Sequence, residues 1–482
     1  MRFLHPERDD LLELALEDVF IVPDYYDGVS RLEADLSPDD FPGSSMPIVS
    51  ANMNAVTGKR MAETMARLGG LGVLPQDMQL ETVERIVHHI QGAHRRFDTA
   101  LTVTPDATIR DVLGIIVKRA HDMVVIVDDH RKPVGIVTSA DLRERDQYTA
   151  VGDIMSTDLV RVNASASGED AFNTMFRARV RAAPIVDDEG RLVGVLGRDD
   201  AVRYELLEPS LDGAGRLRVA AAIGISKDSA SRARSLVKMG VQVIVVDTAH
   251  GHQRRMLEAL NDVRQAVGEN AVLVAGNVCT SAGTEALIGA GADIVKINVG
   301  PGAMCTTRMK TGVGRPSFTS VLHCAQKAHE LGRKVWADGG VKHPRDVALY
   351  LAAGASRVMV GTALAGTFES PGDLKSDEGG RPYKENYGMA SARAVGDRTE
   401  GQSPFERAKK AFFREGISTS RIYLRPGFES VGAIVLDMIT GVQSAFSYVG
   451  AKNLEGFRKQ AVIGVQTMSG YGEGTPHGRV RE

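Results

Sequence analysis

The chain has 482 residues, 43% of them hydrophobic and 25% charged, with a formal net charge of −3. This length allows two or three domains, and the balanced charge excludes the basic excess of a nucleic-acid-binding protein and the acidic tail of a protein with a basic partner. We expect no membrane partner, because the N-terminus lacks a signal-peptide core and no uninterrupted apolar run is long enough to cross a bilayer.

The first part of the chain, residues 1–93, contains two short apolar runs, PIVSAN at 47–52 and LGVLP at 71–75. Continuous apolar runs of this length are typical of parallel strands that are buried on both faces. We therefore expect the first two strands of a parallel sheet here, each followed by a helix.

A duplicated unit follows at about 94–207. The run VVIVDDHRKPVGIVTSADL at 124–142 returns as APIVDDEGRLVGVLGRDDA at 183–201, and Asp128 and Asp141 match Asp187 and Asp200. Each copy predicts a strand, a polar turn, a second strand and a helix that its last aspartate, Asp141 or Asp200, opens as a cap. The period indicates two copies of one α/β unit.

The last part, 208–482, contains six further apolar runs that alternate with helical patterns: RVAAAIG, VQVIVVDTAHG, AVLVAGNV, ADIVKINVG, KVWADGG and SRVMVGTAL. Together with the two runs in 1–93 they make eight strands. Eight strands alternating with helices predict an α/β fold of the (β/α)₈ TIM-barrel class, interrupted after its second β/α unit by the duplicated unit. A doubly wound open sheet is the alternative.

Active sites of such barrels form at the carboxyl ends of the strands, so residues just after the apolar runs are candidates for one mouth. They are Asn52, Met53, Asn54, Asp247, His250, Asn277, Cys305, Asp338, Gly339, Gly340, Gly361 and Thr362.

Cys305 lies in the glycine-rich loop GPGAMCTTRMKTGVG at 300–314, a setting that favours a nucleophile over a packing residue. Cys279 and Cys324 are expected to be packing residues. The three cysteines form no CxxC pair and leave an odd count, which argues against disulfides and structural zinc and for the reducing cytoplasm.

The motifs AGNV, GPGxxCTTR, ADGG, YGMAS and SYVGA, in this order, resemble the IMP dehydrogenase / GMP reductase family over nearly the whole chain. The duplicated unit resembles a cystathionine-β-synthase (CBS) pair, or Bateman module. That second resemblance implies binding of ATP, GTP or both, with Asp141 and Asp200 on the ribose hydroxyls. The family resemblance also implies a homotetramer or an octamer.

The resemblance implies a role for each mouth residue. Cys305 attacks C2 of the purine, the turns of Gly339, Gly340, Gly361 and Thr362 hold the phosphate, and Asp338 binds the ribose hydroxyls. Met53 and Met389 pack on the purine, and Asp247 and Asn277 lie toward a nicotinamide cofactor. Gly300, Gly302 and Cys305 resemble positions whose carbonyls hold a monovalent cation, often K⁺.

The family divides into dehydrogenases and reductases, and three features favour the reductase branch. They are the pair Glu415-Gly416, the segment RMKTGVG and the absence of an adjacent Arg-Tyr pair in the flap, about 366–428. The resemblance then implies NADPH-dependent reductive deamination of GMP to IMP and ammonia, with Cys305, Thr307 and Glu415 catalytic.

Other features keep two alternatives open. The CBS pair and DTAHGH resemble dehydrogenases, which oxidise IMP to XMP with NAD. Ala303 and Ala51 stand where the family commonly has serines, which leaves room for a catalytically weak purine-nucleotide sensor.

Overall fold

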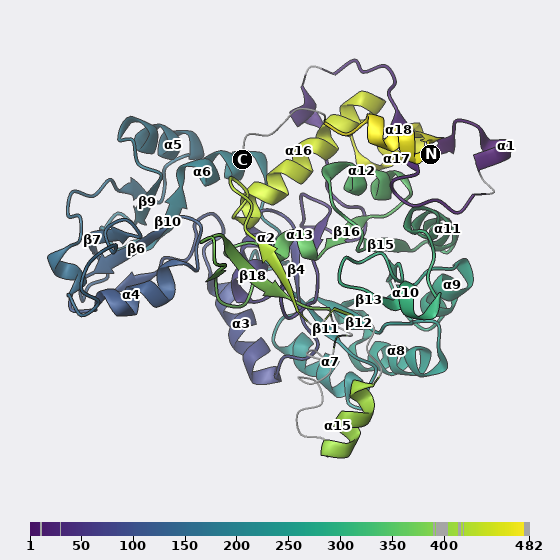
Figure 1. Ribbon diagram of the computed structural model, residues 1–482, viewed down its shortest axis with the longest axis horizontal. Coiled ribbons are helices and arrows are strands. Elements are labelled where there is room, and N and C mark those ends of the chain that lie inside the picture. Colours follow the sequence, from purple (N-terminus) through teal and green to yellow (C-terminus); the bar gives the residue numbers. More distant parts are fainter. Residues whose placement is uncertain are drawn as a thin grey trace.

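The computed structural model describes residues 1–9, 12–28, 30–388, 391, 403–412, 416–417 and 419–476. Eight parallel strands form a closed barrel, which confirms the predicted (β/α)₈ fold and shows that the open-sheet alternative is wrong (Figure 1). In barrel order the strands are β3 (Ile48–Ser50), β4 (Leu71–Leu74), β11 (Ala220–Ile223), β12 (Val243–Asp247), β13 (Val272–Val278), β14 (Ile294–Ile297), β15 (Lys334–Asp338) and β16 (Arg357–Val360).

The barrel strands are continuous apolar runs in the sequence because they contribute to two apolar layers, one inside the barrel and one between the barrel and its helices. Alternate side chains fill the barrel interior, such as Val243, Val245 and Ile294. The residues between them, such as Ile244 and Val295, pack outward against the surrounding helices. Because both faces of each strand are buried, no polar side of the sheet remains to produce alternation.

The helices that follow the barrel strands cover its outer surface. They are α2 (Lys59–Arg67), α3 (Leu80–Gly92), α7 (Ser229–Lys238), α8 (Arg254–Val267), α9 (Ser281–Gly289), α11 (Ser317–Glu330), α12 (Pro344–Ala352) and α16 (Val431–Val449), with the short α10 (Thr307–Thr311) and α13 (Thr362–Ala365) at strand ends. Near the N-terminus lie α1 (Pro6–Asp9), α17 (Leu454–Gln460), α18 (Met468–Glu473) and a sheet of β1 (Arg2–Phe3), β20 (Val462–Val465) and β2 (Val19–Val22).

Helix α16 bears on the expectation that no uninterrupted apolar run can cross a bilayer. By length and composition it is apolar enough to do so, although Asp437 interrupts it, and it is the only such helix in the described part of the chain. Ten of its residues are buried, including Val435, Met438 and Val442, and its contacts include α12, α2 and α13. A core helix of a folded domain passes the same test, and these contacts place α16 in the core of the protein.

The amino-terminal end of the barrel is closed by a buried ion pair. Arg357 of β16 donates from Nε to Oδ2 of Asp40 (2.8 Å) and from Nη2 to Oδ1 (2.9 Å), and both side chains are fully buried. The indole N–H of Trp336 donates to the same carboxylate at 2.7 Å. The guanidinium lies 4.1 Å from the ring centroid of Phe41. This end of the barrel is therefore packed shut.

Residues between α3 and β11 form a separate unit, on the left in Figure 1. It has two three-stranded sheets with the same order and directions, and each has a helix after its first strand. The first contains β5 (Thr102–Val103), α4 (Ile109–Ile116), β6 (Met123–Val127) and β7 (Pro133–Thr138). The second contains β8 (Val162–Asn163), α5 (Gly168–Arg177), β9 (Ala182–Val186) and β10 (Leu192–Gly197).

The expectation that each copy ends in a helix capped by its aspartate is wrong for the first copy, which has no helix there. In the second copy the helix is present as α6 (Arg198–Leu206) after β10, but its N-cap is Gly197 and Asp200 lies in its first turn. In the first copy residues 139–144 form turns. The backbone N–H and hydroxyl of Thr138 both donate to Asp141 at 2.8 Å and hold a local turn. Leu142 is the one buried apolar residue of this charged segment, so no apolar stripe stabilises a helix there.

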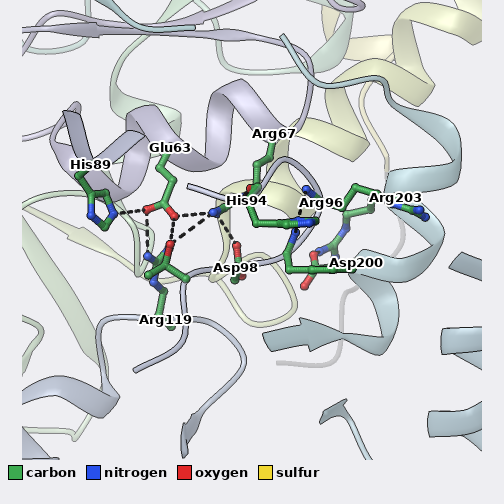
Figure 2. Close-up of polar contacts among 11 residues, drawn as sticks. Glu63, Arg67, His89, His94, Arg96, Asp98, Arg119, Asp200 and Arg203 are labelled. Carbon is green, nitrogen blue, oxygen red and sulfur yellow. Dashed lines mark hydrogen bonds and ion pairs between the residues drawn. The ribbon is translucent and has the colours of Figure 1, made fainter. Parts of the chain in front are cut away.

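Helix α2 of the barrel joins this unit through a buried ionic network, shown in Figure 2. Glu63 binds Arg67 of its own helix (2.6 Å) and Arg119 of the inserted unit (2.9 Å). Burial alone would raise the pKa of Glu63, but Arg67 and Arg119 hold it well below its usual range. Arg67 also binds Asp98, whose backbone pairs with Val195 of the second copy. Both copies thus connect to one helix.

Candidate active site

The side chains expected at the barrel mouth do lie at the carboxyl ends of neighbouring strands. Asp247 ends β12, Asn277 lies near the end of β13, and Asp338 ends β15. Hydrogen bonds connect these strand ends: Asn277 donates to Asp338 at 3.0 Å, and Asn52, after β3, donates to Asp247 at 3.0 Å. The parallel barrel therefore assembles one polar cluster from segments far apart in the sequence.

Cys305 lies in the loop after β14, and its side chain is half-buried. The backbone N–H of Cys305 donates to the carbonyl of Gly302 at 2.9 Å, which folds the loop into a turn. The thiol lies 3.2 Å from Oγ1 of Thr307, within hydrogen-bonding distance. The predicted nucleophile and the predicted proton-transfer partner Thr307 therefore touch each other.

The flap reaches back onto this cysteine loop. It includes a small sheet of β17 (Lys375–Ser376), β18 (Pro382–Asn386) and β19 (Ser420–Tyr423), and the helix α15 (Pro404–Ala411). Gly416 forms an antiparallel bridge with Cys305, and the N–H of Ile417 donates to the carbonyl of Met304 at 3.0 Å. The predicted residues Glu415 and Met389 lie outside the described residues.

Two glycine-containing turns lie at the barrel mouth, one after β15 and one after β16. Gly339 and Gly340 both have a φ of +81°, a conformation that L side chains rarely adopt. A Cβ on Gly339 would come within 3.4 Å of Gly302, so the ADGG turn packs directly against the cysteine loop. At the end of β16, a Cβ on Gly361 would lie 3.4 Å from the sulfur of Met53. Thr362 is the first residue of α13.

Sequence reasoning missed the residues that support this turn. Tyr350 of α12 donates its hydroxyl to the carbonyl of Gly339 at 3.0 Å, and Asn298 donates to the carbonyl of Asp338 at 3.2 Å. Asn298 has a φ of +107° although it is not a glycine. In the sequence, only Asn298 could have been noticed, because it is a polar residue directly after a buried strand. Nothing in the sequence pattern pointed to Tyr350.

Lys296 was also missed, although its signal was visible. It is the one charged residue inside the apolar run IVKINV, and it lies 2.5 Å from Asp338 and 3.0 Å from Asp247. Burial lowers the pKa of Lys296, but the two carboxylates outweigh burial and hold it above its ordinary value.

The predicted cation site consists of backbone carbonyls at Gly300, Gly302 and Cys305. Carbonyl oxygens are suitable ligands for K⁺, and the carbonyl of Gly302, which already accepts from Cys305, keeps a second lone pair. These residues fit the cation in chemistry. Among the described residues, no cluster of three or more His, Cys, Asp and Glu side chains could hold a metal ion.

The two aspartates predicted to bind nucleotides in the inserted unit have different surroundings. The carboxylate of Asp141 binds only to Thr138 within the residues described. Asp200 instead forms an ion pair with Arg203 of its own helix, as Figure 2 shows. Burial raises the pKa of Asp200, although the guanidinium of Arg203 opposes that shift. Gly197, where the first copy has Thr138, has no hydroxyl to offer.

A parallel barrel that brings a cysteine, carboxylates and glycine turns to the carboxyl ends of its strands has the architecture of a catalyst. The fold and the site thus define a (β/α)₈-barrel enzyme.

Comparison with known proteins gives its family. The model of the IMP dehydrogenase / GMP reductase domain matches residues 13–477. A GMP reductase of Mycobacterium tuberculosis is 48% identical over 478 residues, which cover 99% of both chains. An inosine-5′-monophosphate dehydrogenase of Aquifex aeolicus is 37% identical, covering 96% of this chain and 95% of its own. The chain belongs to the IMP dehydrogenase / GMP reductase family.

A solved structure of the family matches in three dimensions as well. It is a cysteine-to-alanine variant of the GMP reductase of Trypanosoma brucei in complex with guanosine 5′-monophosphate. The TM-score is 0.69 and the sequence identity 31%, over 99% of this chain and 100% of the other.

Proposed function

We propose that this protein is a GMP reductase: GMP + NADPH + 2H⁺ → IMP + NH₄⁺ + NADP⁺. The observation that carries the proposal is the 48% identity, over essentially the full length of both chains, to a protein named GMP reductase. The dehydrogenases that we compared are at most 37% identical to this chain. The bridge between Cys305 and Gly416 adds support, because Gly416, which follows Glu415 in the sequence, pairs directly with the proposed nucleophile.

The proposed chemistry begins at Cys305. Its thiolate attacks C2 of GMP to form a C–S bond, and the C2–N bond breaks as the amino group leaves as ammonia. Thr307, 3.2 Å from the sulfur, and Glu415 transfer protons to the departing nitrogen. NADPH, when bound, supplies the hydride that C2 accepts, and the thiolate then leaves to release IMP. Each of these steps balances without a further reactant.

The remaining mouth residues position the ligands. Asp338 accepts from the ribose hydroxyls, and backbone N–H groups of Gly340 and Gly361 hold the phosphate, while the N–H of Gly339 donates to the carbonyl of Met359 at 3.3 Å. Met53, in contact range of Gly361, packs on the purine. Asp247 and Asn277 orient the nicotinamide cofactor, and the carbonyls of the cysteine loop hold a monovalent cation.

One assay distinguishes the reductase from its alternatives. Purified protein is mixed with GMP and NADPH, and separately with IMP and NAD⁺, and absorbance at 340 nm is followed. The reductase consumes NADPH in the first mixture only. Formation of XMP in the second mixture would establish a dehydrogenase, and no change in either would favour the weak sensor.

We expect Glu415→Gln to lower turnover by roughly 10²–10⁴-fold, the usual range for loss of a general acid or base. Steady-state kinetics with GMP and NADPH measure the loss. The matched control is Glu378→Gln, a change of an exposed flap carboxylate on a turn away from Gly416. A Glu415→Gln enzyme with normal turnover contradicts the assigned role.

We further propose that residues 94–207 are a CBS pair that senses ATP or GTP and acts on a homotetramer or octamer. Two features support coupling to catalysis. The ionic network in Figure 2 attaches the unit to α2, and α2 begins at the end of the loop that carries Asn52 and Met53. A nucleotide shifts activity only if it binds one state of the assembly more tightly than another.

Because Asp141 and Asp200 have different partners, we predict that they contribute unequally to nucleotide affinity. Asp141→Ala should lower affinity for ATP or GTP by about 10-fold or more, while Asp200→Ala should have a smaller effect, because Arg203 already binds Asp200. Calorimetry measures the affinity, and kinetics with mass photometry measure activity and assembly. Asp129→Ala, on an exposed hairpin turn, is the control. If wild-type protein binds neither nucleotide, the regulatory proposal fails.

A further inference from the structure

A buried lysine lies between the two ligand sites of the proposed enzyme. Lys296 is on β14 and is 2% exposed. Its neighbour two positions earlier, Ile294, points into the barrel core, whereas Val295 packs outward. Lys296 therefore projects into the barrel interior, at the top layer below the mouth. A buried ammonium is retained only where acceptors replace its water.

The surroundings supply those acceptors in full. Nζ of Lys296 lies 2.5 Å from Oδ2 of Asp338 and 3.0 Å from Oδ1 of Asp247, and it donates to Oδ1 of Asn277. An ammonium has three N–H groups, and each has one of these partners. Both carboxylates remain about one-fifth exposed at the mouth. One cation is thus shared by two carboxylates that face solvent and ligands.

We propose that Lys296 is a positioning residue that holds Asp338 and Asp247 oriented for their two ligands, the ribose diol of the nucleotide and the nicotinamide cofactor. This inference rests on the proposed function. Oδ2 of Asp338 already accepts from Lys296 and from Asn277. Within the described residues no hydrogen bond ends on Oδ1 of Asp338, which leaves that oxygen for a ribose hydroxyl.

Asp247, the second carboxylate, is also held in place by Lys296. Asp247 binds Lys296 through Oδ1 and accepts from Asn52 through Oδ2 at 3.0 Å, so its plane is fixed at both oxygens. Without the ammonium, the two carboxylates would lose their shared counter-charge and repel one another out of these positions. A displaced carboxylate loses its charge-assisted hydrogen bonds to ligand hydroxyls.

The test compares Lys296→Met, Lys296→Arg and the surface control Lys342→Met, whose ammonium is exposed and pairs with Glu17. We expect Lys296→Met to raise KM for GMP and for the cofactor by roughly 10–100-fold each, the value of a charge-assisted contact. Lys296→Arg should recover part of both losses.

Binding data separate this inference from the proposed function. GMP and IMP share the ribose, so calorimetry with both nucleotides tests the contact at Asp338 even in a protein that does not reduce GMP. Lys296→Met with wild-type affinity for both nucleotides would overturn the proposal.

If Lys296→Met does not fold, the charge-balanced pair Lys296→Met/Asp247→Asn takes its place. It leaves one carboxylate without a neighbouring like charge. We still expect weaker GMP and IMP binding, because Asp338 has lost one of the two donors that hold it. Wild-type nucleotide affinity in this double variant would equally overturn the proposal.

Discussion

Cys305→Ala is expected to lower the rate of GMP reduction by roughly 10⁴-fold or more, the scale on which loss of a catalytic nucleophile acts, while GMP affinity changes little. The proposed phosphate and ribose contacts come from other strand ends, so the ground-state complex does not need the sulfur. Single-turnover kinetics and calorimetry measure the two quantities.

The other two cysteines are the controls. Cys324 is fully buried in α11, and burial raises the pKa of its thiol to about 11, so it stays protonated near neutral pH. Burial also raises the pKa of Cys279. Cys279→Ser and Cys324→Ala should keep most of the activity. Near-normal turnover in Cys305→Ala would end the covalent mechanism.

Asp40→Ala is expected to lower the free energy of unfolding by about 3–5 kcal/mol. The change leaves the guanidinium of Arg357 buried at the closed end of the barrel without its counter-charge, and it also removes the acceptor of Trp336. Urea denaturation measures the loss. The active site lies at the opposite end of the barrel, so the folded fraction should keep its KM for GMP.

The preceding residue is a matched control for this change. Asp39 pairs with Lys334 and Arg458, but its side chain is 34% exposed, and pairs of this kind contribute about 0–1 kcal/mol. Asp39→Ala should therefore destabilise the protein much less. The double change Asp40→Leu/Arg357→Met should cost less than Asp40→Ala alone, because it leaves no unpaired charge. Equal losses for Asp39→Ala and Asp40→Ala would refute this account.

The barrel could be predicted from the sequence because burial on both faces makes each strand a continuous apolar run. The location of the active-site mouth could be predicted as well, because the carboxyl ends of parallel barrel strands meet at one edge. Lys296 and Arg357 escaped notice for a common reason. Each is a single charge in an apolar strand, and its role depends on carboxylates from distant segments of the chain: Asp338 at the end of β15 for Lys296, and Asp40 in the loop before β3 for Arg357. The contact between Gly416 and Cys305 is equally non-local.

The misjudged helix after Asp141 has a local cause. The two copies carry the same aspartate, but Asp141 is held in a turn by Thr138. Asp200 instead binds Arg203 in a helix whose N-cap, Gly197, makes no side-chain hydrogen bond. A repeat predicts a common architecture, while the local partners in each copy differ.

The inserted unit also bears on how the barrel assembles. Leu74 of β4 pairs with Ala221 of β11, and an unstructured chain of that length would make the closure entropically costly. The unit holds its own entry and exit together, since Asp98 pairs with Val195, and Arg96 lies 3.4 Å from Glu205. Once folded, the unit therefore acts as a short loop between β4 and β11, and we expect this to lower the entropic cost of pairing these two strands.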